Sequence, residues 1–322
     1  MKTELLDADN PAHVERAGEL LKASELVAVP TETVYGLAAD ATNPEAVARI
    51  FAAKRRPRSH PLIVHLASAE KLPRWAKSVP DWVKRVVEQF WPGPLTLLLE
   101  KHASVPDIVT GGLPTIGLRV PDHPVLLGLL KRFDLAVAAP SANLYQRLSP
   151  TTAGQVMSSL GGTIAAVLDG GPCTVGTEST ILRVHGQTAE ILRSGPISAE
   201  DLAPYLPFPV TTPQSHDQAV PGNKQVHYRP VADLLIRSSE ELLPMLEHPP
   251  EGAGFLVHSP ELKRFPAENL VAMPEDHRAY RRALYTRLHE LDGRVKQIWV
   301  ERPPDGAEWL DIRDRLSRAA SH

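Results

Sequence analysis

The sequence predicts an α/β protein with a mixed sheet, followed by a second and smaller α/β domain. Three observations support this prediction. Helical and strand signals alternate over about the first two hundred residues, a proline-rich stretch without either period follows from Pro204 to Pro230, and the alternation then returns. A chain of 322 residues is long enough for one or two domains, each with a core of its own.

Helix starts in the first region are marked by polar residues that precede proline. Asn10-Pro11 and Asn43-Pro44 each place an N-cap before a proline at the first helical position. Ser149 is expected to cap a helix from Pro150 to Leu160, and another helix is expected from Pro124 to Lys131. Short apolar runs predict strands at Leu26–Pro30, Pro61–Leu66, Leu95–Leu99, Thr115–Val120, Leu135–Ala138, Ile164–Leu168 and Ser179–Val184. This order is too irregular for a regular strand–helix–strand repeat, so we expect a mixed sheet.

The proline-rich stretch divides the chain into a first domain of residues 1–205, a linker of residues 206–230 and a second domain of residues 231–322. Proline fixes φ and donates no backbone hydrogen bond, so we expect an extended linker without helix or strand. The second domain carries strand signals at Ala232–Ile236, Gly254–Val257 and Gln297–Val300, and helical signals at Arg278–Leu291 and Trp309–Ala320. These five elements predict a small α/β domain.

Composition argues against several classes of protein. Lysine and arginine number 35 against 38 aspartates and glutamates, a formal net charge of −3, whereas a protein that wraps nucleic acid usually has a strong basic excess. A single cysteine, Cys173, can form neither an intramolecular disulfide nor a cysteine-cluster zinc site. The acidic N-terminal residues do not resemble a signal peptide, and no apolar run approaches the roughly 20 residues that span a bilayer. We therefore expect a cytoplasmic protein.

Familiar nucleotide and metal motifs are missing. There is no Gly-x-Gly-x-x-Gly dinucleotide fingerprint. Residues 171–177 have the spacing of a P-loop, but Thr177 stands where that motif needs lysine. The sequence has no His-Glu-x-x-His and no paired-cysteine metal site. Nucleotide chemistry, if present, must therefore use another kind of site.

The densest cationic cluster lies at Lys54-Arg55-Arg56-Pro57-Arg58, between a helix end and a buried strand. Four cations in five residues are most often a solvated face. They can also hold a triphosphate, which carries about four negative charges. We expect these side chains to lie on a loop rather than in a core.

A different signal is Arg119, a lone cation inside the apolar strand Thr115–Val120. An unpaired charge there would be costly, so Arg119 either pairs with a structural carboxylate or binds an anionic group of a substrate. The residues alone favour the structural pair slightly. His65 is buried by pattern, and a lone buried histidine is more often a satisfied core residue. Cys173 has no nearby base in sequence and is not expected to be a nucleophile.

Taken together, eight segments resemble the YrdC-like family of threonylcarbamoyl-AMP synthases. They occur in the family's order and span about residues 10–205. The segments are Pro30-Thr-Glu-Thr-Val-Tyr-Gly36, Lys54-Arg-Arg-Pro57, Pro61-Leu-Ile-Val64, Trp91-Pro-Gly-Pro-Leu-Thr96, Gly117-Leu-Arg-Val-Pro121, Pro140-Ser-Ala-Asn143, Gly176-Thr-Glu-Ser-Thr180 and Arg193-Ser-Gly195. The segment Pro221–Pro230 resembles the linker of the longer members of the family. The resemblance implies a YrdC-like twisted mixed sheet with an open concave site, and a small Rossmann-like second domain.

The resemblance also implies site residues and an activity. By similarity, the threonine site is lined by Thr33, His65, Arg119, Ala139 and Ser179. The ATP site is lined by Arg56, His60, Thr115, Ser141, Ser149, Arg193 and Tyr228. Lys54 and Arg56 match the catalytic cations of the family. The implied reaction joins L-threonine, bicarbonate and ATP into threonylcarbamoyl-AMP and pyrophosphate, with Mg²⁺ carried by the ATP phosphates and no metal site of the protein's own.

The sequence departs from the family pattern in two places. After Ser-Ala-Asn the family usually has a small Ser-Gly pair, where this chain has Leu144-Tyr145-Gln146. His60 stands where asparagine or aspartate is commoner. Both changes fall next to the implied nucleotide site, and neither removes a positive charge that phosphate binding needs.

Partners follow from the same resemblance. The product would pass to downstream tRNA threonylcarbamoyl transferase proteins, with direct tRNA binding weak or absent and no membrane partner. The competing interpretations are an RNA-binding accessory protein without catalysis, and the carbamoyl transferase module of hydrogenase maturation.

The linker is long enough to cross back over the site, so we expect it to act as a lid through Lys224, His227, Tyr228 and Arg229; the alternative is a passive tether.

Overall fold

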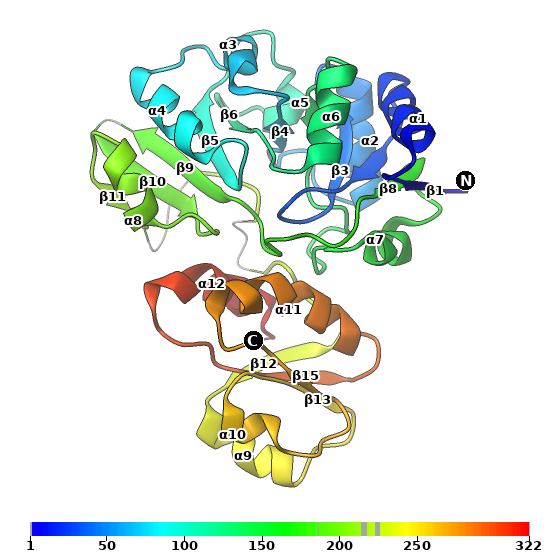
Figure 1. Ribbon diagram of the computed structural model, residues 1–322, viewed down its shortest axis with the longest axis vertical. Coiled ribbons are helices and arrows are strands. Elements are labelled where there is room, and N and C mark those ends of the chain that lie inside the picture. Colours follow the sequence, from blue (N-terminus) through cyan, green and yellow to red (C-terminus); the bar gives the residue numbers. More distant parts are fainter. Residues whose placement is uncertain (1, 186, 214–217, 223–225, 322) are drawn as a thin grey trace. The chain divides into compact units, whose positions relative to one another are not determined.

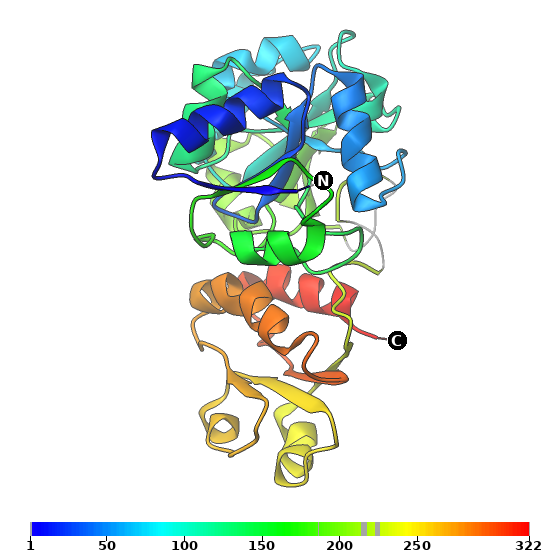
Figure 2. The same cartoon turned by 90° about the vertical axis from the view of Figure 1, so that its right-hand side faces the viewer.

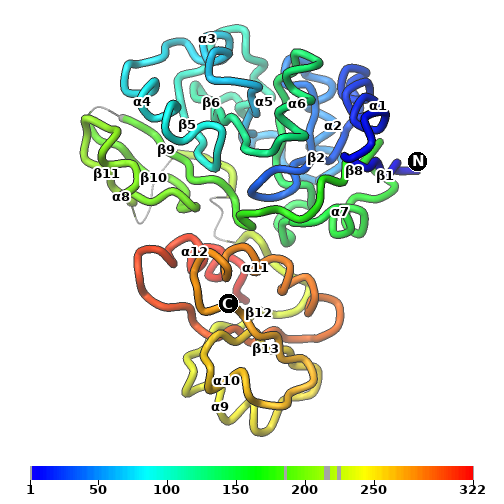
Figure 3. Tube along the Cα trace, in the orientation of Figure 1, coloured from blue at the N-terminus to red at the C-terminus, as the bar shows by residue number. Residues whose placement is uncertain are grey.

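The computed structural model describes residues 2–185, 187–213, 218–222 and 226–321. The chain forms two compact units, which are described separately (Figures 1 and 3). Unit 1 contains Met1–Tyr145, Pro150–Thr174 and Glu178–Asn223, and unit 2 contains Gln146–Ser149, Val175–Thr177 and Lys224–His322. The predicted linker is thus shared between the units. Lys224, named above as a lid residue, lies outside the described residues.

Unit 1 is built on one mixed sheet of eleven strands in the order β1-β8-β2-β3-β7-β4-β6-β5-β9-β10-β11 (Figure 1). The strands are β1 (Glu4–Asp7), β2 (Val27–Val29), β3 (Gly36–Asp40), β4 (Ile63–His65), β5 (Leu95–Glu100), β6 (Thr115–Arg119), β7 (Val137–Ala138), β8 (Ala166–Asp169), β9 (Thr180–His185), β10 (Thr188–Arg193) and β11 (Val210–Thr211). Parallel and antiparallel pairs occur together: β4 pairs β6 in parallel, and β5 pairs β6 antiparallel. The predicted α/β class and mixed sheet are confirmed.

Helices accompany this sheet. They are α1 (Pro11–Lys22), α2 (Pro44–Lys54), α3 (Leu72–Trp75), α4 (Asp81–Phe90), α5 (Asp107–Thr110), α6 (Pro124–Arg132), α7 (Ala153–Leu160) and α8 (Ala199–Leu202), with short 3₁₀ turns at Ala69–Lys71 and Ala203–Tyr205. The side chains of Asn10 and Asn43 accept hydrogen bonds from the first turns of α1 and α2. Both predicted caps, each followed by proline, are therefore confirmed.

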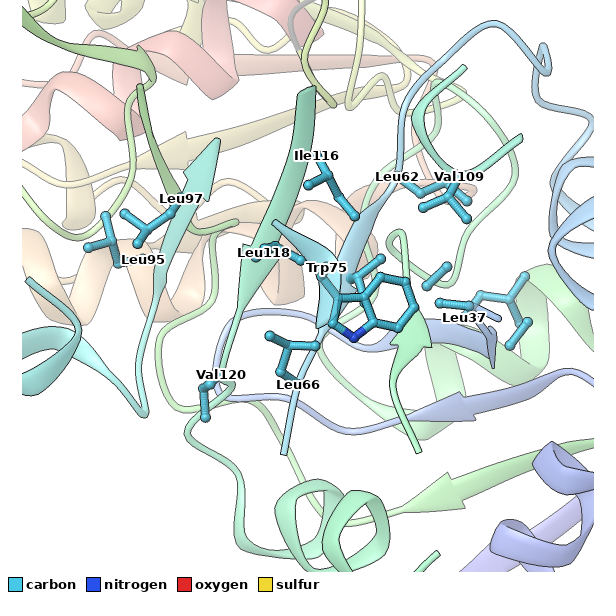
Figure 4. Close-up of a cluster of buried hydrophobic side chains, with 14 of the residues drawn as sticks. Leu37, Leu62, Leu66, Trp75, Leu95, Leu97, Val109, Ile116, Leu118 and Val120 are labelled. Atoms are coloured by element: carbon cyan, nitrogen blue, oxygen red, sulfur yellow. The ribbon is translucent and has the colours of Figure 1, made fainter. Parts of the chain in front are cut away.

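The two faces of the sheet have separate cores because side chains alternate along each strand. In β2, Ala28 belongs to one core, and Val27 and Val29 belong to the other. The first core also holds apolar side chains of α2, α3, α4 and α7; Figure 4 shows part of it, with Trp75 near Leu66 and Leu118. The second core is covered by α1 and α6.

Over β4, β6, β5 and β9, this second face is covered by a different segment. Ile63, Leu98 and Ile181 point to this face, since their neighbours in each strand belong to the first core. They pack against Val220, a residue of the predicted linker. The linker therefore lies on the same part of the sheet that carries Arg119, and a recess there is lined by both sheet and linker residues.

Unit 2 has a four-stranded parallel sheet in the order β12-β15-β13-β14. Its elements are β12 (Asp233–Arg237), α9 (Ser239–Glu247), β13 (Ala253–Val257), α10 (Pro260–Lys263), β14 (Leu270–Ala272), α11 (His277–Leu291), β15 (Gln297–Glu301), a 3₁₀ turn at Ala307–Trp309 and α12 (Leu310–Ala319). Figure 2 shows α9 and α10 on one face of this sheet, and α11 and α12 on the other. The predicted small Rossmann-like α/β domain is confirmed.

Some predictions about local structure were wrong. Ser149 does not cap a helix: α7 begins at Ala153, because Thr152 and Gln155 form a reciprocal capping box. The linker was expected to contain no strand, yet Val210–Thr211 extends the sheet beside β10, since even two residues can pair with an exposed edge. Strands β1, β3, β10 and β14 and helix α9 were not predicted.

Among the described residues, no helix is long and apolar enough to cross a membrane.

Candidate active site

The part of the sheet that the linker covers, in place of a helix, brings several predicted site residues to one face. Thr115 and Arg119 lie on the same face of β6 because they are four residues apart. His65, at the end of β4, is directly opposite Arg119 in the parallel register. On the other side of β6, Thr96 of β5 lies opposite Arg119, because the two strands are antiparallel and Leu97 pairs with Leu118. Thr115 and Arg119 thus mark opposite ends of the face, about 13 Å apart at the usual rise of a strand.

Arg119 is buried and held by three different groups. Its Nε donates to the carbonyl of Gly93 at 3.1 Å, and Nη1 donates to Thr33 Oγ1 at 3.0 Å. Its Nη2 forms an ion pair with Glu32, and both side chains are only 4% exposed. The structural pair considered from the sequence therefore exists. A guanidinium has five N–H donors, so this arrangement leaves donors for an anionic ligand as well.

His65 is a buried imidazole next to this cation. Burial, reinforced by the positive charge of Arg119, lowers the pKa of His65 to about 3. The ring is therefore neutral at physiological pH. Its Nδ1 makes no well-formed hydrogen bond among the described residues, although a backbone contact with Ile63 opposes the lowering of the pKa of the ring.

Ser179 and Arg193 form a second polar group at the Arg119 end of the face. Ser179 Oγ lies 2.7 Å from Thr96 Oγ1, and either hydroxyl can donate. Arg193 donates from Nε and Nη2 to the carbonyl of Ser179, and from Nη2 to its hydroxyl at 3.0 Å. Arg193 Nη1 donates to the carbonyl of Pro221 in the linker. Thr96 was not predicted as a site residue.

The cationic cluster divides into inward and outward side chains. The helix α2 ends at Lys54, and Arg55 adopts a left-handed conformation with φ of 53°. Lys54 and Arg56 are consequently buried, and Arg55 and Arg58 are exposed. The expectation that the cluster lies on a loop outside the core was wrong for Lys54 and Arg56, because the turn at Arg55 directs both side chains inward.

Lys54 is only 1% exposed and binds backbone rather than a carboxylate. Its Nζ donates to the carbonyls of Ser141 and Asn143, each at 2.5 Å. Burial, with a contribution from the charge of Arg56, holds the pKa of Lys54 well below its usual value. The lysine thus fastens the loop after β7 and remains a poorly solvated donor beside it.

Arg56 and His60 meet at Tyr145. Arg56 donates from Nη2 to the carbonyl of Pro61, the residue that leads toward β4. Its guanidinium lies 5.7 Å from the centroid of the Tyr145 ring. The His60 ring approaches the same tyrosine edge-on at 5.4 Å between centroids.

The remaining predicted residues are distributed between the units. Thr115 accepts a 3.3 Å hydrogen bond from Gln218 of the linker, and Ala139 donates its backbone N–H to Ile63. Ser149 and Tyr228 belong to unit 2. There the Ser149 carbonyl lies 3.2 Å from His289 Nε2, and the buried Tyr228 ring lies 5.1 Å from the Arg315 guanidinium. Their roles in ATP binding stay predictions.

Four residues contact the predicted site residues but were not themselves predicted as site residues: Glu32, Thr96, Tyr145 and Gln218. Glu32 and Thr96 lie within the quoted family segments, so a buried strand end next to a polar residue was an available signal. Tyr145 was visible only as a departure from the family pattern. Gln218 had no local signal, because its contact depends on how the linker folds back.

The described residues contain no group of three or more histidine, cysteine, aspartate or glutamate side chains that could hold a metal ion. Burial raises the pKa of the Cys173 thiol to about 12, so it is a poor nucleophile, as predicted. The arrangement suits chemistry in which cations and neutral donors position anionic substrates, without a covalent intermediate.

Fold and site together define an α/β protein in which buried cations and polar side chains gather on a sheet face covered by the linker. Residues 19–195 match the Sua5, YciO and YrdC family model, described as "Telomere recombination". Residues 197–321 match the model of the threonylcarbamoyl-AMP synthase C-terminal domain. The chain belongs to the threonylcarbamoyl-AMP synthase family.

Individual relatives agree along the whole chain. The threonylcarbamoyl-AMP synthase of Bacillus subtilis (strain 168) is 37% identical, covering 99% of this chain and 95% of its own length. That of Pyrococcus abyssi is 34% identical over 95% of this chain and 93% of its own. The crystal structure of P. abyssi Sua5 complexed with L-threonine superposes with a TM-score of 0.90 at 31% identity, covering 99% of this chain and 98% of that one.

Proposed function

We infer that this protein is an L-threonylcarbamoyladenylate synthase that acts on L-threonine and ATP. Membership of the family over both domains supports the inference. The observation that carries it within the structure is the sheet face beneath the linker, which has Arg119, His65 and Ser179 at one end and Thr115 at the other. Two ligands bound at these ends would meet over the middle of the same strands.

Bicarbonate is the third substrate in this proposal. The amine of threonine forms an N-carboxylate with bicarbonate, and water is released. An oxygen of that carboxylate attacks the α-phosphorus of ATP, the bond from this phosphorus to the bridging oxygen breaks, and pyrophosphate leaves. Nothing is oxidised or reduced, and no protein nucleophile is required.

The side chains supply positioning and charge. Arg119 binds the threonine carboxylate through the guanidinium N–H groups that do not bond to Glu32 or Thr33. Glu32 holds the guanidinium in place. The neutral His65 ring has one donor and one acceptor nitrogen, and it is proposed to contact a polar group of the substrate. Lys54, Arg56 and Arg193 offset negative charge on the phosphates and on the N-carboxylate. Mg²⁺ would enter with ATP, bound mainly by phosphate oxygens.

The linker is proposed to act as a lid over this face. Val220 packs on Ile63, Leu98 and Ile181, Gln218 donates to Thr115, and Arg193 donates to Pro221. A lid here would keep water from the N-carboxylate and from the adenylate. A chain that ends near Leu206 is expected to bind ATP more weakly and to lose or leak the adenylate. If the truncated chain synthesises the adenylate as well as the full chain does, the linker is only a tether.

The product is proposed to pass to downstream tRNA threonylcarbamoyl transferase proteins, in the cytoplasm and without strong direct tRNA binding. An RNA-binding accessory protein would release no pyrophosphate, so catalysis separates the two interpretations.

The decisive experiment measures pyrophosphate release with threonine, bicarbonate and ATP each omitted in turn. We expect release to require all three, because the attacking group is the N-carboxylate of threonine. Full-rate release without bicarbonate, or with serine in place of threonine, would refute the proposed function.

A further inference from the structure

The two departures from the family pattern, His60 and Tyr145, are in contact. They are 85 positions apart in the sequence, yet their rings meet edge to face at 5.4 Å between centroids. Arg56 joins them, with its guanidinium 5.7 Å from the centroid of the Tyr145 ring. Two changes that looked independent therefore form one cluster, which we call the Tyr145 cluster: Arg56, His60 and Tyr145.

The position of this cluster is fixed by the backbone. The N–H of Tyr145 donates to the carbonyl of Lys54 at 2.8 Å, and the Lys54 side chain donates to the carbonyls of Ser141 and Asn143. The last residue of α2 thus fastens the loop of residues 141–145 at three points. The tyrosine ring is held at a defined distance from the cations Lys54 and Arg56.

The chemistry of the ring indicates what it meets. A phenol carries no positive charge and offers a phosphate only one neutral hydrogen bond, whereas the proposed function assigns phosphate binding to the cations Lys54, Arg56 and Arg193. A partly buried aromatic ring with a cation on it is the kind of surface on which nucleobases stack. Burial raises the pKa of Tyr145, so the hydroxyl stays protonated at neutral pH and the ring carries no charge that would repel ATP.

We propose that the Tyr145 cluster is the platform for the adenine ring of ATP, with Tyr145 as a stacking residue that this chain has in addition to the family's nucleotide contacts. The proposal rests on the proposed function, because it takes the bound nucleotide to be ATP. In this proposal the His60 ring packs against Tyr145, and the guanidinium of Arg56 lies between the tyrosine ring and the phosphates.

The test compares binding of Mg-ATP and of inorganic tripolyphosphate, which has the phosphates but no base. Calorimetry on the full chain would use wild type, Tyr145→Leu and Tyr145→Phe. Stacking on one aromatic residue changes nucleobase affinity by roughly five- to 150-fold. We expect Tyr145→Leu to weaken ATP binding within that range and Tyr145→Phe to weaken it by less than about threefold. Tripolyphosphate affinity should change by less than about twofold in either variant.

A matched control is Tyr205, another partly buried tyrosine of unit 1, whose ring meets Phe90 edge to face at 5.4 Å. Tyr205→Leu loses a similar aromatic pair and should keep normal ATP affinity. If Tyr145→Leu does not fold, Tyr145→Ser takes its place, since the family usually has small residues in this loop.

The outcomes separate this proposal from the proposed function. Unchanged ATP affinity in Tyr145→Leu or Tyr145→Ser overturns the platform. An equal loss for ATP and tripolyphosphate overturns it too, because the tyrosine would then act by positioning Arg56 for phosphate. Wild-type protein that binds ATP but releases no pyrophosphate would refute the synthase activity and leave the platform standing. Wild-type protein that binds no ATP would overturn both.

Discussion

Buried charges occur in both units, but their partners differ. In unit 2, Asp311 accepts hydrogen bonds from Arg281 at both oxygens and another from Thr177. Glu301 accepts from the backbone of His258 and Ser259. In unit 1, Lys54 donates to the backbone carbonyls of Ser141 and Asn143, and His65 Nδ1 makes no well-formed hydrogen bond among the described residues.

The difference shows that burial of a charge is not by itself a functional signal. Burial alone would raise the pKa of Glu301, yet hydrogen bonds from His258 and Ser259 lower it to about 2. When hydrogen bonds within the protein stabilise a buried charge in this way, the charge is part of the structural scaffold. In unit 1, the donors of Arg119 and Lys54 are only partly compensated by Glu32 and by backbone carbonyls, which fits the proposed binding of anionic substrates.

The largest expected effect comes from removing one arginine of each unit. Arg119→Ala strands Glu32, and Arg281→Ala strands Asp311, so each should lower the free energy of unfolding by about 3–5 kcal/mol. Only Arg119→Ala should weaken threonine binding, by roughly ten- to hundredfold, since it removes a charge-assisted contact. Urea denaturation and calorimetry measure the two quantities.

The double variant Arg119→Ala/Glu32→Gln serves as the control. It should recover part of the stability, because no buried charge is left alone, without recovering threonine affinity. Normal threonine binding in folded Arg119→Ala would make Arg119 a scaffold residue like Arg281.

Lys54→Met is expected to have the next largest effect. It keeps the apolar stem but leaves the carbonyls of Ser141 and Asn143 without their donor, at about 1–3 kcal/mol for each buried group. Turnover should fall roughly hundredfold or more, the usual consequence of losing a preorganised donor. Pyrophosphate release and urea denaturation test both. Lys77→Met is the control: its pair with Glu100 is exposed, and turnover should not change.

His65 predicts a dependence of stability on pH. Its pKa is about 3 when folded and 6.5 when unfolded, so the unfolded chain takes up a proton first as the pH falls. Stability is therefore lost from about pH 6.5 down to about pH 3. In His65→Gln the slope between pH 6 and pH 4 should be smaller by about 1.4 kcal/mol per pH unit. An unchanged slope, from denaturation at several pH values, would mean that the ring is protonated in the folded protein.

The smallest effect is expected from Arg58→Ala. This side chain is exposed, whereas Lys54 and Arg56 of the same cluster are buried. Exposed charges are screened by water and salt, so kcat/KM should stay within about twofold. A large loss of kcat/KM would mean that Arg58 contacts a substrate. The division of the cluster into buried cations at the site and exposed cations outside it would then be wrong.

Local signals accounted for much of the fold. The caps at Asn10 and Asn43 were predictable because a side-chain oxygen next to the first turn is a short-range interaction. Strand β6 was predictable from its apolar run. Strand β3 was missed because Gly36–Asp40 follows a polar segment, and β11 was missed because two residues show no period.

The candidate site was predictable as a set of segments rather than as a geometry. The order of the eight segments indicated the family, and the cations Lys54, Arg56, Arg119 and Arg193 were all named from it. The contacts that Glu32, Tyr145 and Gln218 make with Arg119, Arg56 and Thr115 were not predicted, since these partners lie far apart in the chain.

The sequence by itself determined the α/β class, the two-domain order and the residue types that handle anions, because period, capping and motif order are properties of neighbouring residues. Only the tertiary structure decided which cations face inward, that Arg119 pairs with Glu32, and that His60 meets Tyr145. These depend on the left-handed turn at Arg55, on the register of β4 with β6 and on the return of the linker over the sheet. The strand register and the return of the linker arise from contacts between distant segments, and the turn at Arg55 is a left-handed conformation that no pattern of residue types predicted.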